Sequence, residues 1–256
     1  LVRAWPERLS VFDPASAVSA LNRLGADGPV RVGHDLFALV DRCVGYTAAT
    51  RGAFDVAVGS LMRAHGFRGS PATEIPNDWG ADGLRLEPET ASVSFARPGV
   101  ALDFGAIAKG FVLDLARDEL ADLGVTSALL HGGTSSVLAI GVRPDGDAWR
   151  IRLLTDDPSS PVVELADAAM SVSSLSGRTV SGRSHVMDPA TGLPADGATD
   201  AACVVGSSGE VCEAWSTALL IDPGLAHDLP EGYRCFLRTQ GRWRSPETAV
   251  CSPGPR

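Results

Sequence analysis

Lysine is almost absent from this chain: Lys109 is the only one, and every other member of its 22 basic residues is an arginine. A bias of this kind is typical of GC-rich codon usage, which replaces Lys by Arg wherever only the charge matters. A lysine retained against the bias indicates a position that needs a compact ammonium rather than a planar guanidinium. The alternative is a single exposed lysine at the start of a helix, and composition alone leaves both interpretations open.

Other absences exclude whole classes of function. The chain has no block of Lys and Arg, and its net charge is −9, with 31 acidic against 22 basic residues. We therefore expect neither nucleic acid nor an anionic membrane surface as a partner. No apolar run is long enough to cross a membrane, so no transmembrane segment is expected. Five cysteines without a C-x-x-C pair indicate buried free thiols and favour a reducing, cytoplasmic compartment.

The remaining composition is that of a globular protein, with 45% hydrophobic and 21% charged residues in a chain of 256. Helical periods and short strands occur without regular βαβ alternation, which predicts an α+β fold with mixed, largely antiparallel sheets and flanking helices. We expect one domain over residues 1–251 and a disordered tail at 252–256. Helices are expected at 13–24, at 35–50, between Gly105 and Gly124, and at 210–221. Strands are expected at 84–86, 91–96, 100–103, 127–131, 135–141, 149–155, 162–165, 169–173, 201–206, 233–238 and 242–244.

Four short segments carry residue types that are used in chemistry: 52–59 (GAFDVAVG), 103–110 (DFGAIAKG), 184–192 (SHVMDPATG) and 213–217 (EAWST). Lys109 lies where an apolar stretch leads into a helical pattern, and the N-terminus of a helix favours anions. His185 precedes an Asp-Pro turn, and an imidazole suits a general base at neutral pH. A lone histidine is also a common packing residue, so that alternative stays open.

Glu213 and Thr217 are four residues apart, so both side chains project from one face of the expected helix. A carboxylate and a hydroxyl one turn apart suit a hard cation such as Mg²⁺, completed by carbonyls, waters and phosphates. A solvated helix face is the competing interpretation of the same spacing.

Taken together, these segments resemble the ApbE family of FAD:protein FMN transferases in order and spacing. The family pattern begins with L-S-x-F/Y-D-P-x-S, which residues 9–16 (LSVFDPAS) match. It continues through G-A-F-D-x-x-V-G and D-x-G-A-I-A-K-G to H-I-x-D-P-x-T-G and D-A-x-x-T, which the four segments match in turn. The resemblance covers about residues 8–221.

The resemblance implies an ApbE-like fold in which FAD lies in a cleft between two intimate sub-domains. It also implies a Mg²⁺-dependent transferase that moves the FMN half of FAD to a Thr or Ser hydroxyl of an acceptor flavoprotein and releases AMP. Carried over by motif position, His185 is the catalytic base, and Asp103 and Lys109 hold FAD. The metal ligands would be the Ala106 carbonyl, Glu213 and Thr217, and the walls of the flavin-nucleotide site would be Phe12, Ala53, Phe54, Asp55 and Val186.

The chain departs from the family pattern at several points. Glu213 stands where the family usually has Asp, and the extra methylene moves the carboxylate by roughly a bond length. Residues 131–136 (HGGTSS) replace the commoner Gly-Gly-Asp/Asn, and residues 171–174 (SVSS) replace Thr-Ser-Gly. The N-terminal strand that usually carries Met-Gly-Thr is expected to be missing from this chain.

These departures keep two alternatives open beside transfer. One is an FAD pyrophosphatase that releases FMN and AMP, and the other is a non-catalytic protein that binds FAD. The family implied by the resemblance is often exported or lipid-anchored, so the compartment also stays open.

Overall fold

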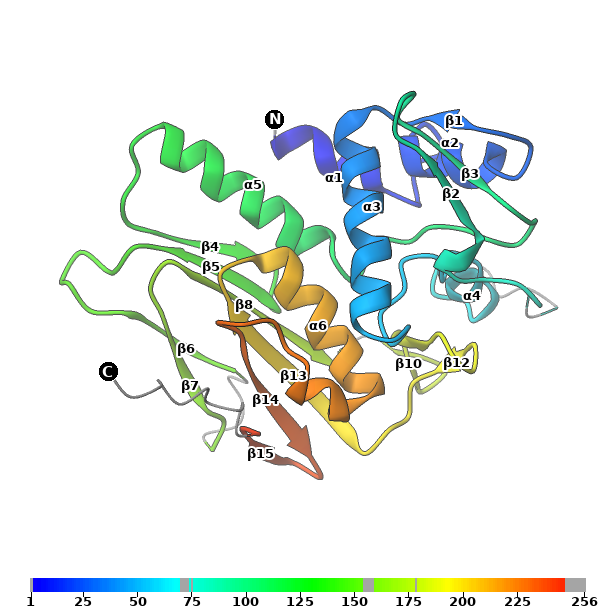
Figure 1. The fold of residues 1–256 in the computed structure, drawn as a ribbon. Helices are drawn as coiled ribbons and strands as arrows, with labels where there is room; N and C mark the ends of the chain where they lie inside the picture. The colour runs from blue at the N-terminus through cyan, green and yellow to red at the C-terminus, as the bar shows by residue number, and fades with distance from the viewer. Residues whose placement is uncertain (1, 70–73, 75, 154–158, 178, 247–256) are drawn as a thin grey trace, which may run out of the picture.

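A large antiparallel sheet with helices on one face makes up one side of the molecule, and a smaller, largely helical region makes up the other (Figure 1). This computed structural model describes residues 2–69, 74, 76–153, 159–177 and 179–246. Within these residues no helix is both long enough and apolar enough to cross a membrane. The predicted class, α+β with largely antiparallel sheets and flanking helices, is confirmed.

The large sheet has the strand order β15-β14-β13-β8-β5-β4, and each neighbouring pair is antiparallel. Its strands are β4 (Ala128–Gly132), β5 (Ser136–Ile140), β8 (Ala168–Ser174), β13 (Thr199–Gly206), β14 (Arg234–Thr239) and β15 (Arg242–Arg244). Strand β13 is buried along almost its whole length because both faces of the sheet are covered. On one face, the hairpin of β6 (Trp149–Arg152) and β7 (Val162–Leu165) supplies Val163 and Leu165, which pack with Met170 and Cys203.

Helices α5 (Ala108–Asp122) and α6 (Gly209–Ile221) cover the other face. Asp114 on α5 caps the start of α6, because its carboxylate accepts hydrogen bonds from the Ser208 hydroxyl and from the Gly209 and Glu210 amides. Gly110 allows the two helices to approach closely, since a Cβ at this position would lie 2.1 Å from the carbonyl oxygen of Gly209. This contact fixes the N-terminus of α5 against α6.

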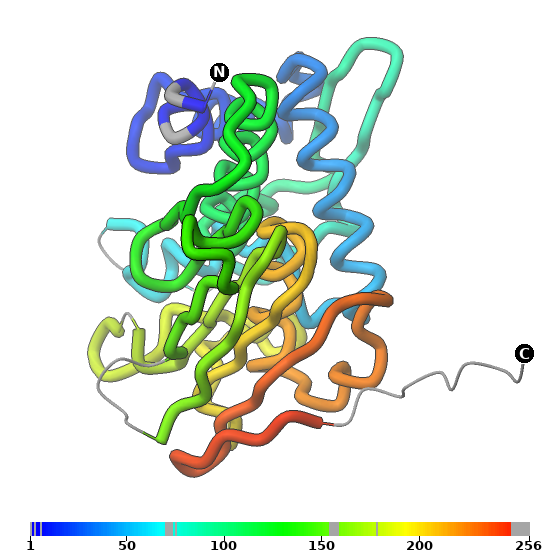
Figure 2. The backbone as a smooth tube through the Cα atoms, turned by 90° about the vertical axis from the view of Figure 1, so that its left-hand side faces the viewer, coloured from blue at the N-terminus to red at the C-terminus, as the bar shows by residue number. Residues whose placement is uncertain are grey.

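The N-terminal region contains helices α1 (Trp5–Leu9), α2 (Ala17–Leu24), α3 (His34–Ala49) and α4 (Gly59–Ala64). A small antiparallel sheet of β1 (Val30–Arg31), β3 (Ser92–Phe95) and β2 (Leu84–Glu87) joins them, in that strand order. Short 3₁₀ segments lie at Val2–Ala4, Ala81–Gly83 and Pro223–His227. Figure 2 shows the start of the chain and α3 at the top of the molecule and the strands near the C-terminus at the bottom.

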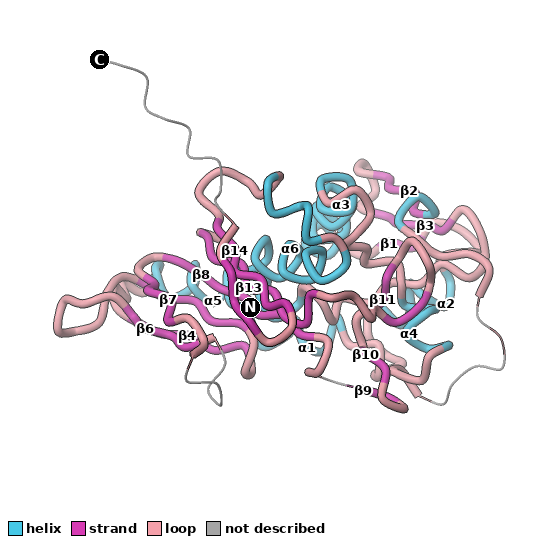
Figure 3. The backbone as a smooth tube through the Cα atoms, turned by 90° about the horizontal axis from the view of Figure 1, so that it is seen from below, coloured by secondary structure: helices cyan, strands magenta, loops and turns pink. Residues whose placement is uncertain are grey.

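Two small hairpins pack beside α4 rather than on the large sheet (Figure 3). They are formed by β9 (Thr179–Val180) with β10 (Arg183–Ser184), and by β11 (Met187–Asp188) with β12 (Leu193–Pro194). His65 Nε2 lies 2.9 Å from the carbonyl oxygen of Gly192, and Trp79 Nε1 donates to the carbonyl of Pro189 at 2.7 Å. The segment that contains His185 is therefore anchored to the N-terminal region.

A hydrophobic cluster of buried residues runs through both parts of the molecule and includes Leu36, Phe54, Phe104 and Trp215. The expected single domain over 1–251 stays a prediction. The tail expected at 252–256 lies outside the described residues.

Most expected elements are present, with ends that shift by a residue or two, but the helix expected over 13–24 begins only at Ala17. Ser16 is its N-cap, because the Ser16 side chain accepts the amide N–H of Ser19. Asp13, at the expected start, instead holds a turn by accepting the amide of Ala15. The short helices α1 and α4 were not predicted, and β6 ends at Arg152, earlier than expected.

The prediction of a strand at 100–103 was wrong. Among the described residues, this segment makes an isolated parallel β-bridge between Ala101 and Val58 instead of a strand pairing. The Asn22 side chain takes the place of a neighbouring strand: its amide donates to the Leu102 carbonyl at 2.9 Å and its oxygen accepts the Leu102 amide at 2.7 Å. The segment is buried, as an apolar pattern predicts. A side chain pairs the backbone of Leu102, whereas the Ala101 carbonyl accepts the Gly59 amide and the Asp103 amide donates to the Val56 carbonyl.

Candidate functional site

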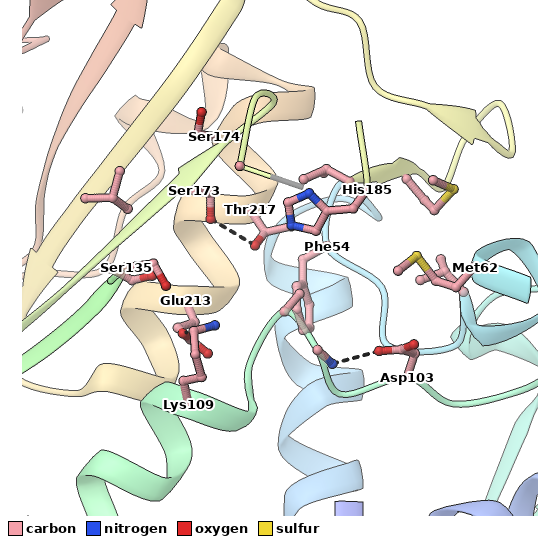
Figure 4. A pocket seen from close by; sticks show the side chains of 18 of the residues that line it. Phe54, Met62, Asp103, Lys109, Ser135, Ser173, Ser174, His185, Glu213 and Thr217 are labelled. Atoms are coloured by element: carbon pink, nitrogen blue, oxygen red, sulfur yellow. Dashed lines mark hydrogen bonds and ion pairs between the residues drawn. The ribbon is translucent and has the colours of Figure 1, made fainter. Parts of the chain in front are cut away.

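A cleft of about 610 Å³ opens between the N-terminal region and the helices of the large sheet. Its walls come from the loop before α4, the N-terminus of α5, strand β8, the segment between β10 and β11, and α6 (Figure 4). Every site residue predicted from the sequence lines it: Phe12, Ala53, Phe54, Asp55, Asp103, Ala106, Lys109, His185, Val186, Glu213 and Thr217. The fold thus brings all of these residues to one place, while their individual roles stay predictions.

Lys109 is the second residue of α5, and its ammonium pairs with Glu213 on α6, with Nζ 2.8 Å from Oε1. The Glu213 side chain is 2% exposed and that of Lys109 is 41% exposed, so the ammonium bridges a buried carboxylate and the open cleft. Ser136, at the start of β5, donates its hydroxyl to the same Oε1. A compact ammonium fits between these groups, which agrees with the interpretation of Lys109 as a retained lysine.

The other carboxylate oxygen of Glu213, Oε2, is buried and has no hydrogen-bond partner among the described residues. Thr217 lies one turn further along α6, and Ala106 lines the same cleft just before α5. Carboxylate, hydroxyl and carbonyl oxygens are hard donors that Mg²⁺ accepts. The residues present therefore fit a magnesium ion, for which Oε2 would be the anionic donor. No group of three His, Cys, Asp or Glu side chains forms a metal site in the described ranges, so water or phosphate would have to complete the coordination.

Serine hydroxyls link strand β8 to α6 beside these donors. Ser173 Oγ lies 3.3 Å from Thr217 Oγ1 (Figure 4). It also lies 2.8 Å from Ser216 Oγ. Ser216 also donates to Ser171 Oγ at 3.3 Å. The segment 171–174, which departs from the family's Thr-Ser-Gly, thus supplies the Ser173 hydroxyl that contacts Thr217 and the Ser171 hydroxyl that accepts from Ser216.

Asp103 is held by Arg68, a residue that the sequence did not single out. Arg68 donates from Nε to Oδ2 at 2.6 Å and from Nη2 to Oδ1 at 2.9 Å, and the Gly105 amide also donates to Oδ1 at 2.8 Å. The side chains of Arg68 and Asp103 are 12% and 4% exposed. Phe12 covers the guanidinium, with its ring centroid 5.3 Å from Cζ. Arg68 lies just after the short helix α4, and its partner is 35 residues away, so no local pattern could have found it.

Asp55 shapes the wall of the cleft through its backbone contacts. Its carboxylate accepts the amide of Ala57 at 2.7 Å and that of Ala81 at 2.9 Å. Burial raises the pKa of Asp55 above its ordinary value, and these two amides partly oppose the shift. Both oxygens have backbone partners, so the clearest task of Asp55 here is to hold the turn that carries Phe54.

His185 and Val186 lie between β10 and β11, on the side of the cleft where Figure 4 shows Thr217. The His185 ring lies against Gly177, where an added Cβ would be 3.7 Å from Cε1. The backbone of Val186 is fixed at both ends, since its amide donates to the Ser184 hydroxyl and its carbonyl accepts the amide of Ala195. The imidazole is thus carried into the cleft on a well-bonded segment.

Known proteins resemble this chain over most of its length. The sequence model of the ApbE family matches residues 1–227. An FAD:protein FMN transferase of Klebsiella pneumoniae is 27% identical over 246 residues, covering 86% of this chain and 72% of the relative. A protein of the same name from Rhodobacter capsulatus is 32% identical over 195 residues, which is 67% of this chain and 35% of the relative.

Solved structures agree with the fold. The ApbE protein of Thermotoga maritima superimposes with a TM-score of 0.86 at 24% identity, covering 95% of this chain and 85% of that one. The flavinyl transferase ApbE of Pseudomonas stutzeri, in its apo form, gives a TM-score of 0.82 at 27% identity, covering 97% and 84%.

Proposed function

Because this chain belongs to the ApbE family, we propose that it is a flavin transferase that moves the FMN half of FAD to a Thr or Ser hydroxyl of an acceptor flavoprotein and releases AMP. The observation that carries the proposal is the cleft of about 610 Å³, which gathers the residues of every matched motif. Similar proteins named FAD:protein FMN transferase support the same activity.

In the proposed reaction the acceptor hydroxyl oxygen forms a bond to the phosphorus of the FMN half. The bond from that phosphorus to the oxygen shared with AMP breaks, and AMP leaves with the electron pair. His185 lines the cleft from the segment that joins β10 to β11, and it takes the proton of the acceptor hydroxyl. Lys109 stabilises the negative charge on the phosphoryl oxygens from the N-terminus of α5, where the helix dipole adds to its effect.

The Ala106 carbonyl, Glu213 and Thr217 would hold Mg²⁺ at the polar end of the cleft. The ion would neutralise the diphosphate and assist the departure of AMP. The unpartnered Oε2 of Glu213 supports this assignment, because a buried carboxylate oxygen without a donor is costly unless a ligand satisfies it.

Intact-mass spectrometry tests the proposal. The protein is incubated with FAD, Mg²⁺ and a panel of flavin-free acceptor flavoproteins, each beside a version in which the target Thr or Ser is Ala. We expect an FMN adduct on an unmodified acceptor and none on its Ala version. Free FMN and AMP without an adduct would show FAD hydrolysis instead, and unchanged FAD throughout would show that the protein does not turn FAD over.

A further inference from the structure

Ser136 is a buried serine at the start of β5, and its hydroxyl donates to the carboxylate of Glu213. Ser136 is 1% exposed and is not among the described residues that line the cleft, whereas Glu213 is. The serine therefore has no direct access to a ligand in the cleft. Any effect that it has on such a ligand passes through Glu213.

The strands of the large sheet hold Ser136 in place. It pairs with Gly132 on β4 and with Ser171 on β8, so β5 has a hydrogen-bonded neighbour on each side at this position. Gly132 keeps room for the contact, because a Cβ there would lie 3.1 Å from the Cβ of Lys109 and 3.4 Å from that of Ser136. The Lys109 side chain, in contrast, is 41% exposed. Of the two donors to Glu213, Ser136 is the one that the backbone fixes.

The two oxygens of the Glu213 carboxylate have different surroundings. Oε1 accepts from Ser136 and pairs with the Lys109 ammonium, while Oε2 is buried and has no partner among the described residues. A glutamate has one more rotatable bond than an aspartate, so it loses more conformational entropy when its carboxylate is fixed on a ligand. A hydrogen bond from a rigid strand to Oε1 fixes the carboxylate beforehand and leaves Oε2 for the ligand.

Ser136 and Glu213 both lie where the chain departs from the family pattern. Glu213 stands in place of the usual Asp, and Ser136 ends the unusual segment 131–136 (HGGTSS). The fold joins these two departures by a hydrogen bond. An aspartate at position 213 would draw the carboxylate back by about one C–C bond, roughly 1.5 Å, and out of reach of the Ser136 hydroxyl. The serine thus serves the longer side chain.

We propose that Ser136 is a positioning residue that fits Glu213 to the magnesium site, by holding Oε1 so that Oε2 is the oxygen that binds the ion. The inference rests on the proposed function for the identity of the ion. Hydrogen-bond partners of metal-binding carboxylates orient the ligand, and their loss typically weakens metal binding about 10- to 100-fold.

Binding of Mn²⁺ alone to the full chain, followed by the electron paramagnetic resonance signal of the free ion, tests the proposal. Mn²⁺ accepts the same oxygen donors as Mg²⁺. We expect Ser136→Ala to weaken Mn²⁺ binding about 10- to 100-fold, and Ser136→Thr, which keeps the hydroxyl, to restore it. The matched control is Ser60→Ala, because Ser60 is another buried serine and its hydroxyl has no partner among the described residues. This control should bind Mn²⁺ like the wild type.

Melting temperatures show which variants fold. If Ser136→Ala does not fold, Ser136→Cys keeps the test available, since a thiol of similar size is only a weak donor and should also weaken Mn²⁺ binding.

The dependence on a glutamate is tested by the same substitution in Glu213→Asp. The shorter carboxylate does not reach Ser136, so on that background Ser136→Ala should change Mn²⁺ affinity by less than about twofold. An equal loss on both backgrounds would show that the serine only supports the fold around the site, and it would overturn the positioning role.

A folded Ser136→Ala variant with wild-type Mn²⁺ affinity would also overturn the positioning role, and so would a wild-type chain that binds no Mn²⁺. A wild-type chain whose Mn²⁺ binding depends on Ser136, but which flavinylates no acceptor, supports the positioning role and removes the proposed function. The two failures are therefore distinct.

Discussion

The pair of Lys109 and Glu213 allows a quantitative prediction, because one partner is buried and the other is near solvent. In Lys109→Met the Glu213 carboxylate, which is 2% exposed, would keep the Ser136 hydroxyl as its remaining donor on Oε1. Breaking a fully buried ion pair costs about 3–5 kcal/mol, whereas exposed pairs contribute about 0–1 kcal/mol. Since the lysine side chain is 41% exposed, solvent screens part of the interaction.

We therefore expect Lys109→Met to lower the free energy of unfolding by about 1–3 kcal/mol. For a chain of this size each kcal/mol shifts the melting temperature by about 2–4 °C, so the variant should melt roughly 2–12 °C lower. Much of this cost belongs to the carboxylate left without its cation rather than to the lost contact itself.

The assay is thermal unfolding of four proteins: the wild type, Lys109→Met, Glu213→Gln, and the double variant. Glu213→Gln removes the buried charge, so on that background Lys109→Met should cost less than about 1 kcal/mol. The same loss on both backgrounds, or no loss on either, would refute the claim that Lys109 neutralises a buried carboxylate.

Three further predictions concern the site. Glu213→Ala should abolish Mg²⁺-dependent transfer, because the metal site loses its anionic donor. Glu213→Asp should retain or improve the transfer activity. Transfer by Glu213→Ala that survives a chelator would contradict the metal assignment. His185→Ala should lose about 10²–10⁴-fold in single-turnover transfer with little change in FAD affinity, and a parallel loss of melting temperature and FAD binding would show a packing role instead. Burial raises the pKa of Asp55 above its ordinary 3.8, so near that pH the folded state holds a proton that the unfolded state releases, and the stability contributed by this group falls as pH rises above about 4. The stability of the wild type relative to Asp55→Asn should therefore increase from pH 7 towards pH 4 in denaturant titrations. A pH-independent difference would exclude the pKa shift.

Elements with long periodic patterns could be predicted from the sequence, and elements formed by tertiary contacts could not. Helices α3, α5 and α6 follow their apolar spacing closely. The helix α4 is only six residues long and begins with Gly59-Ser60, which gives no helical signal. It forms because Leu61 and Met62 pack with Phe67, which directly follows the helix, and with Met187, which comes from a distant part of the chain.

The candidate site shows the same division. The motif residues could be found because their spacing matches a family, and the structure brings them to one cleft. Ser136 lies in a segment that departs from the family pattern, and the departure marked that segment as unusual. The hydrogen bond from Ser136 to Glu213 could not be predicted, because the two residues are 77 positions apart in the sequence. Arg68 gave no signal at all, because its bonds to Asp103 and its stacking on Phe12 exist only in the folded chain.

The most direct test of the central claim is the ratio of AMP released to acceptor flavinylated in a single turnover. With FAD, Mg²⁺ and an acceptor that becomes flavinylated, we predict one AMP for each FMN adduct, because the acceptor hydroxyl is the group that displaces AMP. AMP formed together with free FMN and without an adduct would contradict it, since water would then be the attacking group.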